Sequence, residues 1–189
     1  SLRETESIAS RPLRYAWKEQ AILRDLEFEY EAFEPFVGRL RLPTRDPEET
    51  KQATAYCQDY GWGPGQNGHC EPWYDEAFQV GLDGIRARIE SRERTETRQC
   101  FLIVLEGFQA MIGNAARAAE AAGNRELAAD CRRIMHRPPE TFRQALEMMH
   151  LIDLGIQCGS RAGLVGPGRI DRRLIDFYRR DLAAKRITR

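Results

Sequence analysis

The sequence is poor in lysine and has no excess of charge of either sign. It contains three lysines against 26 arginines, and 29 basic residues balance 29 acidic ones, so the formal net charge is +0. Proteins that bind duplex nucleic acid or anionic membrane surfaces usually carry a basic excess. No apolar run approaches the ~20 residues of a membrane-spanning helix. We therefore expect neither nucleic acid nor a membrane among the partners.

Metal-binding and nucleotide-binding motifs are also missing. The five cysteines include no CxxC pair, and no two of the three histidines have the i, i+4 spacing of a helical zinc pair. Neither glycine-rich segment places a GxGxxG loop between a strand and a helix, and GxxxxGK[ST] is absent. We expect no metal and no cofactor to be bound by this segment. The first residues lack the apolar core of a signal peptide, which predicts a cytoplasmic protein with reduced thiols.

Apolar residues at helical spacing dominate what is present. Hydrophobic residues make up 42% of the 189 positions, enough to form the core of one domain or of a piece of a larger one. The spacing predicts helices over residues 12–33, 50–58, 75–92, 97–122, 127–135, 140–152 and 170–182. Short extended segments are expected at 36–40 and 162–165. The residues therefore predict a mainly α fold.

Two glycine-rich segments, residues 61–72 and 158–168, interrupt the helices. Both are predicted to be loops, and long ordered loops tend to carry function. The sequence GPGR at 166–169 leads into a helix N-terminus and suits either an anion site or a simple glycine turn. His69 lies just before a helix, where it suits either proton transfer or capping of that helix. A nucleophilic pair of His69 and Cys70 is disfavoured because adjacent side chains rarely face each other.

Four stretches match, in order, the motifs of one enzyme family. Residues 33–39 (FEPFVGR) match E-P-hydrophobic-V-G-R, and 68–69 (GH) with Tyr74 and 81–85 (GLDGI) match G-H-x-x-x-D-Y…G-hydrophobic-x-G-I. Residues 137–146 (RPPETFRQAL) resemble P-P-x-T-F-x-E-A-L-Q, and 168–171 (GRID) with 178–182 (YRRDL) resemble S-x-G-R-hydrophobic-D-Q-Y-L-x-P-Y-Y-x-x-D-L. Together they resemble the N-terminal part of the pyruvate formate-lyase domain of glycyl radical enzymes.

The resemblance implies that residues 1–189 are the N-terminal portion of such a domain. The expected fold is the helical N-terminal part of a ten-stranded β/α barrel, truncated before most of the barrel. The catalytic cysteine loop and the glycyl radical would lie beyond Arg189, so no catalytic residue is expected in this segment. The family's chemistry is thiyl-radical hydrogen abstraction from a small organic substrate by a lyase, dehydratase, decarboxylase or acyltransferase, in anaerobic metabolism.

The resemblance also implies partners. A radical S-adenosylmethionine activating enzyme would install the glycyl radical, and the chain's own C-terminal part would pack against this segment. A small-molecule substrate is expected, and a homodimer is left open. The alternative is a non-catalytic helical scaffold, or a partner-binding module, derived from the same family.

By resemblance, His69 matches a histidine of the family's substrate pocket, and we expect Trp73, Gly166 and Arg169 to bind substrate beside it. Trp73 stands where the family has Asp, Gly166 where it has Ser, and residues 171–173 (DRR) where it has D-Q-Y. The first two changes remove polar groups that would satisfy the hydroxyls of a vicinal diol. We therefore expect a larger or more apolar substrate than a diol.

Overall fold

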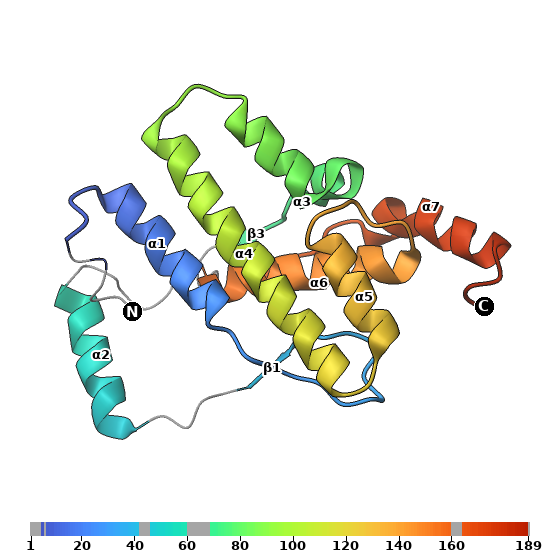
Figure 1. Cartoon of the computed structure of the whole chain (residues 1–189), viewed down its shortest axis with the longest axis horizontal. Helices are drawn as coiled ribbons and strands as arrows, with labels where there is room; N and C mark the ends of the chain where they lie inside the picture. Colours follow the sequence, from blue (N-terminus) through green and yellow to red (C-terminus); the bar gives the residue numbers. More distant parts are fainter. Residues whose placement is uncertain (1–4, 6, 42–45, 60–68, 160–163, 189) are drawn as a thin grey trace.

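In the computed structural model, helices pack around one long central helix, α4 (Figure 1). The structure describes residues 5, 7–41, 46–59, 69–159 and 164–188. Its helices are α1 (Arg11–Arg24), α2 (Pro47–Asp59), α3 (Tyr74–Glu90), α4 (Glu96–Ala121), α5 (Arg125–Ile134), α6 (Phe142–Gly159) and α7 (Ile170–Ala183). Its strands are β1 (Phe28–Glu29), β2 (Arg39–Leu40), β3 (His69–Cys70) and β4 (Leu164–Val165). The mainly α prediction is confirmed.

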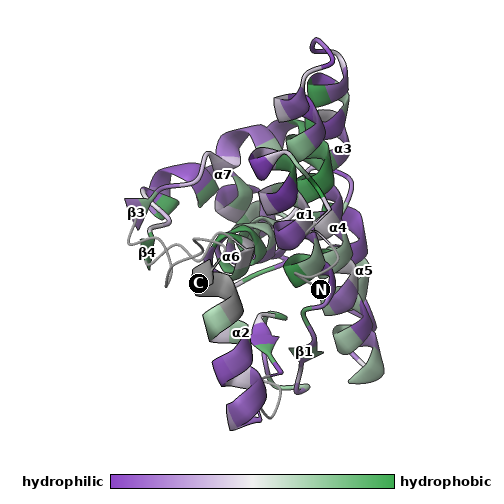
Figure 2. Cartoon of the chain, turned by 90° about the vertical axis from the view of Figure 1, so that its left-hand side faces the viewer, coloured by the Kyte–Doolittle hydropathy of each residue, from purple (hydrophilic) through white to green (hydrophobic). Residues whose placement is uncertain are grey.

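The core lies where α1, α5 and α6 meet α4. The fully buried side chains there are Met111, Ile112, Ala115 and Ala119 of α4, Leu127, Ala128, Cys131 and Ile134 of α5, and Met148 and Leu151 of α6. Each large apolar side chain removed from water contributes about 1.5–3 kcal/mol, so this set dominates the stability of the fold. In Figure 2, α6 is seen close to end-on inside the molecule and is mostly hydrophobic.

A carboxylate of α7 binds the first turn of α6. Asp181 of α7 is almost fully buried and accepts a 2.8 Å hydrogen bond from the backbone N–H of Phe142, the first residue of α6. The first turn of a helix has unsatisfied N–H groups, and a carboxylate is favourable there. Arg186 compensates the buried charge at 2.8 Å. This contact gives the aspartate of the C-terminal stretch YRRDL a structural role.

α2 is peripheral. It lies away from the other helices in Figure 1, and its first nine residues, 47–55, are all exposed. Figure 2 shows it as mainly hydrophilic. Across the described ranges, no helix is both long and apolar enough to cross a bilayer.

The helix predicted over residues 12–33 is wrong beyond Arg24. The chain leaves the helix at Asp25, and Phe28 and Glu29 pair with Leu40 and Arg39 in the antiparallel β1–β2 ribbon. Residues 26–31 (LEFEYE) alternate apolar and acidic side chains, which is the period-two pattern of a half-exposed strand. The predicted strand at 36–40 is correspondingly shorter, because only Arg39 and Leu40 are paired.

Three further predicted boundaries shift. Helix α6 begins at Phe142 rather than near Glu140, because the Thr141 hydroxyl accepts from the N–H of Gln144 and caps it. The expected loop at 61–72 contains strand β3 at residues 69–70, while residues 61–68 lie outside the described part. Of the strand expected at 162–165, Leu164 and Val165 are confirmed, and 162–163 lie outside it as well.

Helix α3 is kinked at Gly81. This residue has φ +68°, and a Cβ there would lie 2.6 Å from the backbone C of Arg137 and 2.7 Å from the carbonyl oxygen of His136. Only glycine accepts both the left-handed conformation and this close approach. Asp83 then donates its N–H to the same His136 carbonyl at 2.9 Å. The kink gives α3 one half that packs near β3 and another that runs beside α4.

Candidate functional site

The parallel pair β3–β4 brings together two of the predicted site residues. His69 lies opposite Leu164 and Cys70 opposite Val165, and the N–H of Gly166 donates to the Cys70 carbonyl at 2.8 Å. The two glycine-rich segments, far apart in the sequence, are thus neighbours in space. His69 is exposed on β3. It does not cap α3, whose N-cap is Trp73 and which has no side-chain capping bond.

Trp73 and Arg169 occupy equivalent positions, each at the N-cap of the helix that follows one strand. The Trp73 side chain is 76% exposed, so a large aromatic surface is available beside β3. Arg169 is engaged by Asp171, with 2.5 Å between Nη2 and Oδ2. This hydrogen-bonded pair holds the pKa of Asp171 at about 2. A substrate anion would have to compete with Asp171 for Arg169.

Tyr74 and Asp153 form a buried contact beneath these residues that sequence reasoning missed. Tyr74 is fully buried at the start of α3, and its hydroxyl donates a short hydrogen bond to Oδ1 of Asp153 on α6. Burial raises the pKa of Asp153, and the bond from Tyr74 opposes that shift. Burial and the carboxylate beside it also raise the pKa of Tyr74, which keeps the phenol protonated. The only sequence signal was the tyrosine of the G-H motif.

Arg173, in the first turn of α7, was also missed as a candidate. Its Nη1 lies 2.9 Å from Oε1 of Glu71 and donates to the carbonyl oxygen of Pro167 at 3.0 Å. Gly168 packs directly on this ion pair with φ +62°, and a Cβ there would lie 2.1 Å from Glu71 Oε1. The GPGR turn is thus a glycine turn held by an arginine, one of the two interpretations that the sequence allowed.

The pair of His136 and Asp83 lies on other elements, after α5 and within α3. His136 bonds to Asp83 at 3.0 Å, on the surface, as expected of a histidine at a helix end. Burial tends to raise the pKa of Asp83, but the hydrogen bonds from His136 and Gln109 outweigh it and lower the pKa. Within the described ranges, no three His, Cys, Asp or Glu side chains are grouped to hold a metal ion.

Glu147 and Cys131 form a second buried polar pair, inside the core. The Cys131 thiol lies 3.6 Å from Oε1 of Glu147, which also accepts from the N–H of Val37 at 3.2 Å. The other carboxyl oxygen of Glu147 is buried without a hydrogen-bond partner. Burial raises the pKa of Glu147 to about 8, which favours the protonated carboxyl at neutral pH. Burial also raises the pKa of Cys131 and keeps it a thiol.

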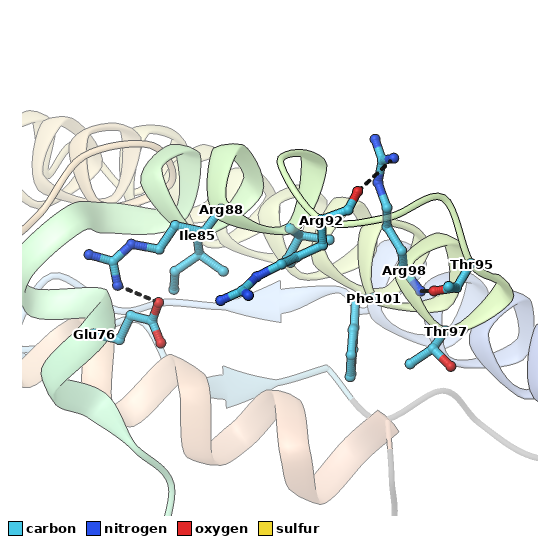
Figure 3. A pocket seen from close by; sticks show the side chains of 9 residues that line it. Glu76, Ile85, Arg88, Arg92, Thr95, Thr97, Arg98 and Phe101 are labelled. Carbon is cyan, nitrogen blue, oxygen red and sulfur yellow. Dashed lines mark hydrogen bonds and ion pairs between the residues drawn. The ribbon is translucent and has the colours of Figure 1, made fainter.

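An apolar groove runs along α3 and α4 towards α6. Two cavities of about 470 and 290 Å³ form it, and they share Ile85, Ile89 and Phe101. Phe101 is 58% exposed although the helical pattern places it on the apolar face of α4. Figure 3 shows Ile85, Arg92 and Phe101 extending into the same space. None of the four predicted site residues lines either cavity.

Comparison with known proteins identifies relatives of this arrangement. The pyruvate formate lyase-like family profile matches residues 44–189. The probable dehydratase YbiW of Escherichia coli K12 is 43% identical over 56 residues, which are 30% of this chain and 7% of that protein.

Solved structures match the whole chain at low identity. One is from work on 1,2-propanediol dehydration in Roseburia inulinivorans (TM-score 0.81, 19% identity), covering 100% of this chain and 34% of that one. A glycyl radical enzyme from Archaeoglobus fulgidus (TM-score 0.78, 18% identity) matches 100% of this chain and 35% of its own. The B12-independent glycerol dehydratase from Clostridium butyricum with bound glycerol (TM-score 0.78, 17% identity) matches 100% of this chain over 34% of its own length.

The chain therefore spans about a third of the length of these solved structures. The resemblance predicted from the motifs is confirmed, and the family profile covers most of the chain. This chain belongs to the pyruvate formate lyase-like family.

Proposed function

We propose that this chain forms the helical shell of a glycyl radical enzyme and supplies part of its substrate pocket. The observation that carries the proposal is the β3–β4 pair, which sets His69 beside the turn that begins at Gly166. Reactive radical intermediates must be kept from solvent, and a helical layer around the reacting centre serves that purpose. The segment's own contribution is to orient the substrate and to move protons.

His69 is the residue we assign to proton transfer or hydrogen bonding with the substrate. Its exposed position on β3 leaves the imidazole open to a ligand. An imidazole accepts or donates a proton near neutral pH when it lies within hydrogen-bond reach of the reacting group. We assign no catalytic radical role to any cysteine of this segment.

Trp73, Gly166 and Arg169 are proposed to set substrate preference. The indole of Trp73 offers apolar surface, while Gly166 leaves space and no hydroxyl beside β3. A pocket with few hydrogen-bonding groups selects weakly for hydroxyls. We propose a larger or more apolar organic substrate than the glycerol and 1,2-propanediol named for the structural neighbours.

The apolar groove is proposed to receive another part of a longer chain of this family. The structural neighbours are about three times as long as the portion matched here, so a longer chain of this family has polypeptide available to cover the groove. Phe101, Ile85 and Ile89 expose apolar area that is costly to leave in water. Arg92 at the edge has no ion-pair partner in the described chain and favours an acidic residue on the covering segment.

The cofactor of the assembled enzyme would be a glycyl radical outside these 189 residues. It supplies hydrogen-atom abstraction, and a radical S-adenosylmethionine activating enzyme would install it. This segment is proposed to bind neither metal nor nucleotide. A cytoplasmic location and a homodimeric assembly are consistent with the proposal and remain part of it.

The test is His69→Ala in an activated enzyme that contains this segment. Turnover should fall by roughly 10²-fold or more, because one positioned acid or base contributes about that much. The glycyl radical signal and the thermal unfolding temperature should stay unchanged. His136→Ala is the matched control, since His136 is exposed and bonded to Asp83 away from β3. Unchanged turnover in His69→Ala would exclude the assignment.

The alternative function is a non-catalytic helical scaffold, and the exposed groove is the observation that favours it. Reading the encoding frame past Arg189 separates the two. An open frame with a cysteine loop and a terminal R-V-x-G-Y glycine motif supports the enzyme. A frame that stops at once supports the scaffold, and the groove is then a partner-binding surface.

A further inference from the structure

Four parts of the candidate site converge on one side chain, that of Arg173. Its Nη1 pairs with Glu71, which follows β3, and donates to Pro167, which follows β4. Its Nε lies 3.6 Å from Oδ1 of Asp75 in the first turn of α3. Its guanidinium carbon lies 5.3 Å from the centre of the Tyr74 ring. We call Arg173, Glu71, Asp75, Tyr74 and Pro167 the Arg173 cluster.

We propose that Arg173 is a positioning residue that fixes the β3–α3 connection against the β4–α7 connection. On the proposed function, these connections carry His69 and Trp73 on one side and Gly166 and Arg169 on the other. Arg173 therefore sets the distance between the two halves of the substrate pocket without touching the substrate itself.

The burial of Arg173 distinguishes it from the other arginines near the site. Its side chain is 17% exposed, although its partners Glu71 and Asp75 are 56% and 40% exposed, whereas the Arg169 side chain is 63% exposed. Exposed ion pairs contribute little, because water and salt screen them and two flexible side chains must be ordered. A largely buried guanidinium with a planar fork of donors holds several acceptors in one fixed geometry.

The cluster is needed because the strands themselves are short. β3 and β4 are two residues each. An isolated two-stranded ribbon is at best marginally stable in water. The bond from Gly166 to Cys70 therefore needs support from side chains. Gly168 shows how tightly the support fits, since its Cβ position would be 2.5 Å from Arg173 Nη1.

The test measures hydrogen exchange at the Gly166 amide by NMR in the 189-residue chain without substrate. Arg173→Ala should lower the protection of this amide by about tenfold or more, because strands β3 and β4 can then separate without unfolding of the rest of the chain. Ile112, in the core, reports whether the rest of the fold is intact. Arg172→Ala is the matched control, because Arg172 lies in the same turn, is exposed and has no side-chain partner in the described chain. Gly166 protection unchanged in Arg173→Ala would overturn the proposal.

A charge exchange keeps the test decisive if Arg173→Ala does not fold. Glu71→Arg alone should lose the Gly166 protection, and the double variant Glu71→Arg with Arg173→Glu should regain at least part of it. Failure of the double variant to regain any protection, with Ile112 still protected, would count against a specific contact.

The activated enzyme separates this proposal from the proposed function. If the positioning role and the proposed function both hold, Arg173→Lys misplaces the pocket and lowers kcat by roughly tenfold or more. The double variant Arg173→Lys with His69→Ala then lowers kcat by less than the product of the two single-variant reductions. If His69→Ala alone leaves turnover unchanged, the proposed function fails, while hydrogen exchange at the Gly166 amide still decides whether Arg173 holds the two connections together. If His69→Ala lowers turnover and Arg173→Lys does not, the positioning role is wrong.

Discussion

The region around α4 and the region around β3 and β4 are held together by different forces. Around α4, three helices bury a continuous set of apolar side chains. Near the strands, the apolar cluster is smaller: Tyr74, Ala145, Met149 and Leu174 are buried, and partly buried side chains such as Phe78 and Phe177 pack against them. The ion pair of Arg173 with Glu71 and the hydrogen bond that Tyr74 donates to Asp153 add polar contacts there. We therefore expect the core to withstand changes near the site, and the site to depend more strongly on its few polar contacts.

The largest effect is expected from emptying the larger core. Ile112→Ala should lower the free energy of unfolding by about 2–5 kcal/mol, because it removes a fully buried side chain and leaves a cavity. Leu174→Ala, in the small cluster, should lie at the lower end of that range, near 2 kcal/mol, since its surroundings can relax. Urea unfolding followed by circular dichroism measures both. Equal losses would remove the contrast between the two regions.

Gly81 lies at the kink of α3, between the half near β3 and the half beside α4. Its substitution tests how strongly the fold depends on that kink. Gly81→Ala should cost about 2 kcal/mol or more, because the left-handed conformation and the backbone at 2.6 Å both oppose a Cβ. Gly113→Ala is the control within a helix. Its Cβ would meet Met135 Sδ at an ordinary 3.4 Å, so stability should rise by up to about 1 kcal/mol. Thermal unfolding of both variants measures these changes in stability.

The buried carboxyl of Glu147 should make the stability of the core depend on pH. Burial raises its folded-state pKa from 4.5 to about 8, so the folded protein retains the proton that the unfolded chain loses. The stability from this group is complete below about pH 4.5 and is lost as pH rises towards 8, at no more than about 1.4 kcal/mol per pH unit. Glu147→Gln should remove this slope. Chemical unfolding between pH 5 and 8 compares the proteins, and parallel curves would contradict the assignment.

Tyr74→Phe tests a single polar contact beneath the site. Removing the hydroxyl leaves the half-buried Asp153 without its donor, which should cost about 1–2 kcal/mol. The pKa of Asp153 should rise further, because the bond that lowers it is lost. NMR titration of the Asp153 carboxyl measures that shift. An unchanged titration would mean that the two side chains are not bonded in solution.

The smallest effect is expected at His69 itself. His69→Ala should change stability by no more than about 0.5 kcal/mol, because the side chain is exposed and makes no hydrogen bond within the described chain. Thermal unfolding of the unliganded chain measures this. A loss comparable to that of Tyr74→Phe would show that His69 is structural rather than free for a ligand.

The helices could be predicted because their apolar residues repeat at helical spacing and their ends carry caps. Thr95 and Asn124 each accept a hydrogen bond from a backbone N–H in the first turn of the helix that follows. The β1 strand was missed although its apolar and acidic residues alternate, because short strands form only when a partner such as β2 is present.

The candidate site was only partly predictable. Motif resemblance selected His69 and Gly166, and the structure brings them together across β3 and β4. Arg173 and Asp153 carried no local signal, since their partners lie far away in the sequence and only the fold makes them neighbours. In the sequence, Arg173 marked only a departure from a family motif.

The connectivity of the β3–β4 pair has a consequence for the order of folding. Helices α4 and α5 are joined by a short turn, so their contacts close a small loop and form early. His69 and Leu164 are separated by the whole α3–α6 segment, so pairing them closes a much longer loop at a greater entropic cost. We therefore expect the α4–α5 contacts to form before the β3–β4 pair, so that the candidate site is completed late in folding.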